Sequence, residues 1–311
     1  MITRRQILKL GTSMLVLPFS NLLAKENSSS SSTLPLIQPK IPSSGELLPV
    51  IGMGTSRTFN TDNNQESLAK LTAVINAFFE GKGMVIDSSP MYGNAESRVG
   101  DVLRGMKNHP KVFAATKVWT TGKEQGIAEM QESAKRMNVK HFDLIAVHNL
   151  VDWGTQLATL KEWKKEGKVR YIGITTSHGR DHDEFLQVMK KEPIDFVQFS
   201  YNISNLTAEK EILPLAKNRG IATMINRPYQ RGSLFRVSKG KPLPPIAKEI
   251  DCTSWGQFYL KFILGHPAVT CVIPATSKPH HMVDNMKANF GRLPDQAMRM
   301  EMLKIFNKLQ A

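Results

Sequence analysis

The sequence predicts an α/β fold in which parallel strands, each followed by a helix, close into a barrel. From Ile41 onward, short apolar runs typical of strands recur about every 30 residues, and eight can be counted. The segments between them carry apolar residues at helical spacing. Eight strand–helix units in roughly 270 residues match the (β/α)8 TIM barrel. An extra C-terminal helix is predicted because Met298, Met302, Phe306 and Leu309 repeat at helical spacing.

The predicted strands are short apolar runs, several of which finish abruptly in a polar residue. An open, doubly wound sheet is the competing fold, and it would want a glycine-rich turn after the first strand. Gly52-Met53-Gly54-Thr55 supplies only Gly-x-Gly-Thr, so the barrel is favoured. The predicted strands are Val50–Gly54, Met84–Asp87, Val112–Thr116, Leu144–His148, Tyr171–Thr175, Phe196–Ser200, Ile221–Ile225 and Val269–Ile273.

The predicted helices carry apolar stripes that we expect to face the core rather than a ligand. The first stripe follows the first predicted strand, and Gly81 ends it. Two well-formed stripes are Leu68, Leu71, Val74, Ile75, Phe78 and Trp255, Phe258, Tyr259, Phe262, Ile263.

A leader precedes the predicted barrel. Thr3-Arg4-Arg5-Gln6-Ile7-Leu8-Lys9 resembles a twin-arginine export signal, and a short, broken apolar stretch follows from Leu10 to Ala24. We therefore predict a signal peptide at residues 1–24, a flexible Ser-rich linker at residues 25–40 and the barrel at residues 41–311. Cleavage near Ala24 and retention as a tether both stay open. The leader implies that the twin-arginine machinery exports the protein, to the periplasm or beyond.

Composition argues against several classes of function. The 311 residues carry a formal net charge of +14, but no basic arm, zinc-finger spacing or aromatic–basic interleaving indicates nucleic acid. The two cysteines, Cys252 and Cys271, fit neither a metal site nor a disulfide framework. No run reaches the roughly 20 apolar residues of a membrane span. We expect a monomer without a metal, whose positive field favours an anionic cofactor.

Polar residues end several neighbouring strands. Asp87, Lys117 and His148 fall at or just after the ends of three apolar runs, and Tyr92 lies in the loop beyond Asp87. Because the carboxyl ends of barrel strands meet at one mouth, we expect the four side chains to lie together. A tyrosine, a lysine, a carboxylate and an imidazole make a proton donor for a carbonyl oxygen. This combination predicts a nicotinamide-dependent carbonyl reductase.

The roles follow from ordinary acid–base chemistry. A free tyrosine has a pKa of about 10 and donates poorly at neutral pH. A neighbouring ammonium group is expected to lower that pKa, and a carboxylate keeps a buried lysine charged. Tyr92 is therefore the predicted general acid, Lys117 its tuner, Asp87 the anchor of Lys117, and His148 the residue that orients the substrate carbonyl.

Three separated segments resemble the aldo/keto reductase family. Ile41–Thr55 is similar to its opening hairpin and first strand, Asp87–Glu96 to its second-strand signature, and Val272–Asn285 to its nucleotide-binding segment. The resemblance extends from about Ile41 to Asn289 and implies a barrel with an N-terminal β-hairpin. It also implies that a nicotinamide nucleotide supplies hydride while the protein positions the reactants.

The resemblance assigns a cofactor site to residues spread along the chain. Gln198 matches the family glutamine that contacts the carboxamide, and Lys278 at the adenosine end favours NADP(H), with NAD(H) as the alternative. Thr175 and Thr176 stand where the family usually has Ser-Asn, and Asn226 stands where it has a stacking aromatic, beside an unusual Arg227. The implied cofactor residues are Gly54, Thr55, Thr175, Thr176, Gln198, Asn226, Arg227, Ser277, Lys278, His281 and Asn285.

Loops after the strands are expected to shape the substrate pocket. Trp119 and Trp153 follow the third and fourth strands and are predicted to form an apolar wall. The long connection Arg227–Pro245 is predicted to act as a lid, in which Tyr229, Leu234 and Phe235 cover the cofactor.

The function that the sequence predicts is NADP(H)-dependent reduction of an aldehyde or ketone to an alcohol, or the reverse oxidation. Because export would separate the protein from free nucleotide, we expect nucleotide to be bound before export and held tightly. The alternative is a nucleotide-binding sensor or interaction subunit with little turnover, which Thr176 and Asn226 motivate.

Overall fold

The computed structural model describes residues 34–177 and 179–310. The predicted twin-arginine signal and most of the Ser-rich linker lie outside the described residues. Part of the predicted linker pairs with the C-terminal part of the barrel unit: Ile37 N donates to Asn289 O, and Gly291 N donates to Pro35 O. The compact unit therefore begins at Leu34. No helix of the described part has the length and apolarity to cross a membrane.

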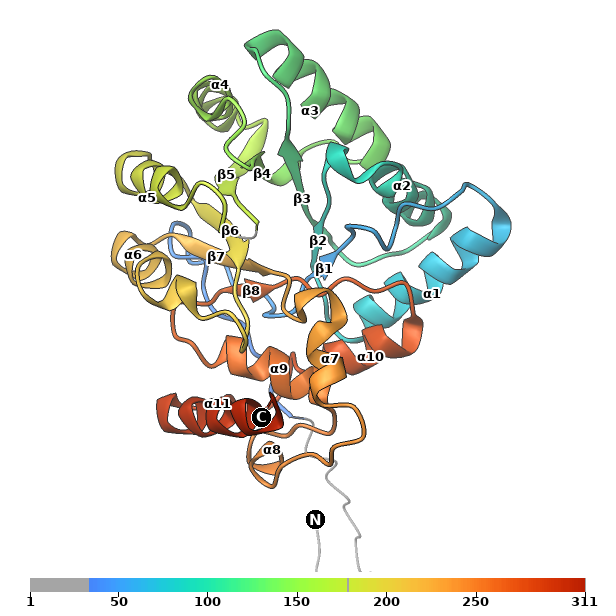
Figure 1. The fold of residues 1–311 in the computed structure, drawn as a ribbon. Helices are drawn as coiled ribbons and strands as arrows, with labels where there is room; N and C mark the ends of the chain where they lie inside the picture. Colours follow the sequence, from blue (N-terminus) through green and yellow to red (C-terminus); the bar gives the residue numbers. More distant parts are fainter. Residues whose placement is uncertain (1–33, 178, 311) are drawn as a thin grey trace, which may run out of the picture. The chain divides into compact units, whose positions relative to one another are not determined.

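Eight parallel strands form the sheet, in the order β1 to β8, which confirms the predicted fold class (Figure 1). Neighbours in sequence are neighbours in space, as repeated strand–helix units require. The strands are β1 Met53–Gly54, β2 Val85–Asp87, β3 Phe113–Val118, β4 Phe142–His148, β5 Val169–Thr175, β6 Phe196–Ser200, β7 Ala222–Asn226 and β8 Cys271–Val272.

The first and last strands meet and close the barrel. Parallel bridges join Ile51 to Val272 and Gly54 to Ala275. Gly52 N donates to Val272 O at 2.9 Å, and Val272 N donates to Val50 O at 2.8 Å. Closure thus involves residues 50–54 and residues 272–275, although only two residues of β1 and two of β8 form a regular strand.

Helices surround the strands, and the amphipathic stripes predicted from sequence face them (Figure 1). The helix after β8 is followed by the predicted C-terminal helix, α11. The helices are α1 Gln65–Glu80, α2 Ala95–Gly105, α3 Lys123–Met137, α4 Trp153–Lys165, α5 His182–Lys191, α6 Ile212–Arg219, α7 Ser233–Val237, α8 Ile246–Glu249, α9 Trp255–Leu264, α10 Pro279–Lys287 and α11 Gln296–Gln310, with short 3₁₀ turns η1 Pro90–Tyr92, η2 Thr207–Glu209 and η3 Gln230–Gly232.

The N-terminal hairpin closes one end of the barrel. Lys40 and Leu47 form an antiparallel bridge, and Ile41 N donates to Glu46 O at 2.8 Å. Ile41 and Leu48 are fully buried in the same apolar cluster as Phe113, at the start of β3. The hairpin therefore covers the amino ends of the strands and leaves their carboxyl ends for the site.

A buried glutamate connects α2 to β3 and α3. Glu96, in α2, accepts hydrogen bonds from Thr116 Oγ1 at 2.6 Å and Ser133 Oγ at 3.0 Å. Four residues along α2, a Cβ at Gly100 would lie 1.9 Å from the Arg136 carbonyl oxygen. Only glycine allows this close approach of α2 to α3, which fixes the position of the loop that carries Tyr92.

Candidate active site

Polar side chains from several strands point inward at the carboxyl end of the barrel, because side chains alternate between the two faces of a strand. Side chains two residues apart share a face, and the inward rows contain Val85, Phe113, Leu144, Phe196 and Met224 in one buried apolar cluster. At the carboxyl ends these rows continue into polar residues: Asp87, Lys117, His148, Thr175, Gln198 and Asn226. The structure thus brings together the three strand-end residues that the sequence placed at one mouth.

The Lys117 ammonium group is wholly buried beneath the mouth. Its Nζ donates to Asp87 Oδ1 and Oδ2 at 2.8 Å each and to the Ser88 carbonyl oxygen at 2.7 Å. These acceptors match the three donors of an ammonium group. Burial acts to lower the pKa of Lys117, but Asp87 and Tyr92 outweigh it, so the pKa is raised and the lysine stays charged.

Tyr92 is presented by the short turn η1 just beyond β2. The turn begins after Ser89 and ends at Gly93, whose positive φ of 62° suits glycine. The Tyr92 ring stands edge-on to the His148 ring, with centroids 5.7 Å apart. Lys117 Nζ lies 5.3 Å from the Tyr92 ring centroid. Tyrosine, lysine and histidine therefore share one small region of the mouth.

The pKa of Tyr92 is raised above its ordinary value, which corrects the direction expected from Lys117 alone. Burial raises this pKa, Lys117 lowers it and Asp87 raises it. Because Asp87 offsets the charge of Lys117, the burial of the phenol prevails. The hydroxyl is accordingly protonated at neutral pH, which is the state that a proton donor requires.

His148 is buried and fixed by a serine. Its Nδ1 lies 2.9 Å from Ser89 Oγ, which also accepts from Met91 N at 3.3 Å. Burial, followed by the charge of Lys117, lowers the pKa of His148 to about 3, so the imidazole is neutral at physiological pH. Its Nε2 has no hydrogen-bond partner among the described residues. One ring nitrogen is thus held by protein and the other is available to a ligand.

Gln198 connects the Lys117–Asp87 pair to the next strand. Its Nε2 donates to Asp87 Oδ1 at 3.0 Å, and its Oε1 accepts from Thr175 Oγ1 at 3.2 Å. All three side chains also line the cavity described below. Gln198 Nε2 also donates to Met224 Sδ at 3.1 Å, so its two hydrogens and the Thr175 hydroxyl hydrogen are all engaged. The side-chain oxygens of Gln198 and Thr175 keep lone pairs that can accept from a ligand amide.

The side-chain amide of Asn226 forms hydrogen bonds within the protein through both its oxygen and its nitrogen. Ser200 Oγ donates to Asn226 Oδ1 at 2.6 Å, and Asn226 Nδ2 donates to the Thr176 carbonyl oxygen at 3.1 Å. The amide therefore ties the end of β7 to β6 and to the segment after β5. The cavity lining at this position is polar, where the family that the sequence resembles usually has a stacking aromatic side chain.

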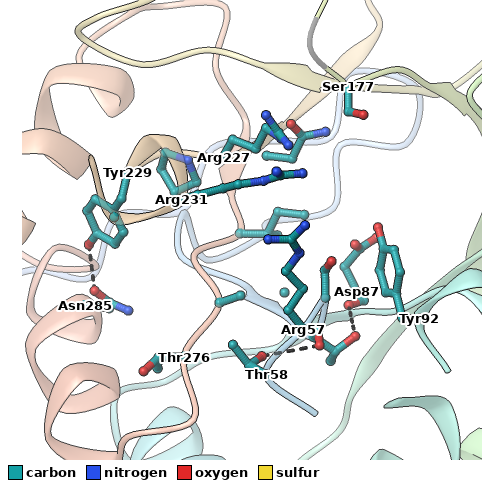
Figure 2. Close-up of a pocket in the computed structure, with 18 of the residues that line it drawn as sticks. Arg57, Thr58, Asp87, Tyr92, Ser177, Arg227, Tyr229, Arg231, Thr276 and Asn285 are labelled. Carbon is teal, nitrogen blue, oxygen red and sulfur yellow. Dashed lines mark hydrogen bonds between the residues drawn. The ribbon is translucent and has the colours of Figure 1, made fainter. Parts of the chain in front are cut away.

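A cavity of about 1240 Å³ opens at the carboxyl ends of the strands. Figure 2 shows Asp87 and Tyr92 at one side of it, and the hydrogen-bonded pair Tyr229 and Asn285 at the other. The sequence-predicted residues that line it are Gly54, Thr55, Asp87, Tyr92, His148, Thr175, Gln198, Asn226, Arg227, His281 and Asn285.

The remaining predicted residues lie elsewhere. The Thr176 hydroxyl donates a hydrogen bond to the Arg180 carbonyl oxygen at 2.8 Å. Ser277 and Lys278 are exposed before α10 and do not line the cavity. Trp153 donates its indole N–H to Glu184 at 2.7 Å, away from the cavity. Trp119 is 42% exposed, with its ring centroid 6.4 Å from that of His148, so it stands beside the mouth.

The predicted lid contacts the opposite wall of the cavity. Tyr229 donates its hydroxyl to Asn285 Oδ1, in α10, at 2.6 Å. Its ring lies 4.8 Å, centroid to centroid, from that of Phe235. Both aromatic residues line the cavity, so the connection Arg227–Pro245 covers the part that lies farther from Tyr92.

Sequence reasoning missed three arginines. Arg57, Arg180 and Arg231 line the cavity together with the predicted Arg227. They come from loops after β1, β5 and β7, so no local sequence pattern connects them. Figure 2 shows Arg57, Arg227 and Arg231 between the two sides of the cavity.

Comparisons with known proteins agree with this arrangement. The model of the aldo/keto reductase family matches residues 50–300. The chain is 25% identical to the methylglyoxal reductase YeaE of Escherichia coli, over 78% of this chain and 87% of that relative. It is 26% identical to the NADH-specific methylglyoxal reductase of Escherichia coli, over 48% of this chain and 53% of the relative. An aldo-keto reductase from Klebsiella pneumoniae solved with NADPH shares the fold, with a TM-score of 0.71, 20% identity, and coverage of 87% of this chain and 96% of that one.

Proposed function

This chain belongs to the aldo/keto reductase family, and from that premise we propose that it reduces the carbonyl group of a small aldehyde or ketone with NADPH. The observation that carries the proposal is the convergence of Tyr92, Lys117, Asp87 and His148 at one side of a single cavity. Two relatives named as methylglyoxal reductases support a small carbonyl substrate. The neighbour solved with NADPH supports NADP(H) as the nucleotide.

The residues present fit a nicotinamide dinucleotide. The cavity runs from the tyrosine to α10, which gives space for an extended ligand of two nucleotides. Gln198 and Thr175 offer amide and hydroxyl groups at the side of Tyr92, and Asn285 and His281 line the other side. Arginines lie between them, where a diphosphate group would meet positive charge.

The chain's own groups would act on the carbonyl oxygen. A bound nicotinamide nucleotide would supply a hydride to the carbonyl carbon. Tyr92 would give its hydroxyl proton to the oxygen, and Lys117 would stabilise the resulting phenolate through its charge, since its three donors are already engaged. Asp87 keeps Lys117 charged, because its carboxylate raises the pKa of the buried ammonium group.

His148 would hold the carbonyl oxygen in line with Tyr92. We assign Nδ1 as the acceptor of the Ser89 hydroxyl, because Ser89 Oγ already accepts from Met91 N and keeps its own hydrogen to donate. This assignment leaves the imidazole proton on Nε2, the nitrogen without a described partner. Nε2–H would then donate to the substrate oxygen, and Ser89 serves as a positioning residue.

Nucleotide binding and turnover test the proposal directly. Titration of the full-length protein with NADPH is expected to quench tryptophan fluorescence in a saturable way, because Trp255 lines the cavity. NADH should bind more weakly. Methylglyoxal should then cause loss of the reduced nicotinamide absorbance. Folded, nucleotide-free protein that responds to neither nucleotide would contradict the proposal.

Replacement of Ser89 with alanine is expected to lower kcat for carbonyl reduction by about tenfold, the effect of roughly one hydrogen bond to a functional group. KM should change less, because Ser89 acts through His148 and not on the substrate. Nitrogen NMR should show His148 protonated on Nε2 in the wild type and as a mixture of tautomers in the variant.

Ser88→Ala is the matched control for Ser89→Ala. Ser88 is equally buried, but its hydroxyl accepts from Thr55 and does not contact His148. Because the lowered pKa of His148, about 3, keeps its imidazole neutral, no activity loss between pH 5 and 8 should arise from this histidine in any of the three proteins. Unchanged tautomer signals in Ser89→Ala would refute the assigned role.

A second candidate function is a nucleotide-binding sensor with little turnover. The hydrogen bonds of Asn226 to Ser200 and Thr176 favour it, because this amide offers no aromatic face to the nicotinamide. Saturable NADPH binding without reduction of any carbonyl in a broad screen would favour the sensor. Turnover that disappears when Tyr92 is changed would exclude it.

A further inference from the structure

Four guanidinium groups meet in the cavity that holds the candidate catalytic residues. Arg57 follows β1, Arg180 follows β5, and Arg227 and Arg231 follow β7, and all four line the cavity. Arg227 is half-buried, and the other three are exposed toward the opening. Positive charge from three separate loops is therefore concentrated in one place.

These guanidinium groups have no ion pair or side-chain hydrogen bond with any residue that the structure describes. The two carboxylates that line the cavity are engaged elsewhere. Asp87 binds Lys117 and Gln198. Asp284 accepts from Ser254 Oγ at 2.6 Å and from Gln257 Nε2 at 2.7 Å. The arginine cluster therefore has donors for an anion that the described protein does not supply.

The four guanidinium groups repel one another because all carry positive charge. Burial lowers the pKa of Arg227 to about 10, and the charges of Arg231, Arg57 and Arg180 act in the same direction, while Tyr92 acts against them. A bound anion would relieve this repulsion.

Three of the four arginines also occupy a strained backbone conformation. The φ angles are 65° at Arg57, 54° at Arg227 and 56° at Arg231, in the left-handed region that side chains other than glycine and asparagine rarely adopt. Such strain gathers at ligand sites, where the side chain must point in one direction. The backbone of Arg227 is fixed by Asn202 Nδ2, which donates to its carbonyl oxygen at 3.0 Å.

The diphosphate group of a bound dinucleotide accounts for only part of this charge. The diphosphate of a nicotinamide dinucleotide carries about two negative charges, one on each phosphate, against four guanidinium groups. Arg227 also lies close enough to Tyr92 for each to affect the pKa of the other. An anion at the Tyr92 side of the cluster would thus belong to the molecule whose carbonyl oxygen Tyr92 protonates.

We propose that the Arg57–Arg180–Arg227–Arg231 cluster selects carbonyl substrates that carry a carboxylate. This inference rests on the proposed reductase function and narrows its substrate class. In the reaction, the carbonyl carbon gains a hydride, and so two electrons, from NADPH, which becomes NADP⁺. The carbonyl oxygen gains the Tyr92 proton, and solvent later returns a proton to Tyr92. The carboxylate remains unchanged and is held by the planar guanidinium donors.

Two substrates of equal chain length test the proposal with the full-length protein. Succinic semialdehyde carries the carboxylate, and butanal lacks it. The wild type should have a kcat/KM for succinic semialdehyde at least about tenfold above that for butanal, the effect of a charge-assisted contact. The ratio should fall about tenfold in Arg57→Gln and in Arg231→Gln, and further in the double variant. Both side chains are exposed and without described partners, so the fold should tolerate the changes.

Arg236→Gln is the matched control. Arg236 belongs to α7 in the same lid, is exposed, and does not line the cavity. In Arg236→Gln, the ratio of kcat/KM for succinic semialdehyde to kcat/KM for butanal should equal that of the wild type. If the cluster variants lose activity on both substrates equally, so that the ratio stays constant, the arginines serve the nucleotide diphosphate and the proposal is overturned.

The anion site can be tested even if turnover is absent. Should NADPH bind while neither aldehyde is reduced, the proposed reductase function fails, and succinate serves as an unreactive probe. Succinate should then raise the Tm of the NADPH-loaded wild type and of Arg236→Gln, but not of the double variant. No shift in the wild type would overturn the anion site as well.

Discussion

Tyr92→Phe is expected to lower kcat for carbonyl reduction by about 10²- to 10⁴-fold, because it removes the proton donor and leaves the ring in place. The phenyl ring can still stand edge-on to His148, so the fold and NADPH affinity should change little. The measurement is steady-state reduction of methylglyoxal or succinic semialdehyde. Activity in Tyr92→Phe close to that of the wild type would refute the role of Tyr92.

Tyr171→Phe is a matched control for the loss of a tyrosine hydroxyl. Tyr171 lies near the start of β5, where its hydroxyl donates to Ser44 Oγ at 2.7 Å in the N-terminal hairpin. This end of the barrel is opposite to the cavity, so catalysis should be retained.

The raised pKa of Tyr92 predicts the pH dependence of the wild type. A proton donor works in its protonated form, which persists below its pKa, so reduction should stay constant through neutral and moderately alkaline pH. Alcohol oxidation needs the phenolate, and its rate should rise with pH over the same range. A reduction rate that falls as pH rises through neutrality would show that the charge of Lys117 outweighs burial once ligands are bound.

Lys117→Met is expected to lower the free energy of unfolding by about 3–5 kcal/mol, because it leaves the buried Asp87 carboxylate without its partner. Carbonyl reduction should be lost as well, since the buried ammonium group that lies 5.3 Å from the Tyr92 ring no longer stabilises the phenolate. Chemical denaturation followed by circular dichroism measures the first effect, and the assay above measures the second.

A double variant separates the two effects. Lys117→Met combined with Asp87→Asn removes both charges and should recover a large part of the lost stability without recovering activity. Lys70→Met is the control at an exposed pair, because Lys70 and Glu66 are both largely exposed and their ion pair should contribute little. If the double variant is as unstable as the sum of the single variants, Lys117 and Asp87 do not act as a pair.

Much of the barrel could be predicted because its signal is local. Apolar runs and helical stripes are properties of neighbouring residues in the sequence. Alternate side chains of a strand point inward, so Asp87, Lys117 and His148 could be predicted to lie at the same end of the barrel. Strand bounds were least accurate at β1 and β8, where closure depends on pairing between segments more than 200 residues apart. Neither segment contains a local sequence pattern that indicates this pairing.

The parts of the site that sequence missed depend on loop conformation. Arg57 and Arg231 carry no pattern that separates them from solvated arginines, and only left-handed backbone angles direct them to the cavity. Trp153 was expected at the mouth because it follows β4, but as the first residue of α4 it turns toward α5 and Glu184. The pKa of Tyr92 was misjudged because the balance between burial and a neutralised lysine is a property of packing.

The left-handed arginines also bear on attempts to engineer this protein for heat tolerance. Glycine relieves the backbone strain at such positions, and a screen for thermal stability would favour it at residues 57, 227 and 231. Each accepted substitution would also delete a guanidinium group from the cavity. A variant selected only for thermal stability would therefore lose positive charge from the cavity. Its thermal stability would rise while its discrimination between charged and uncharged substrates would fall.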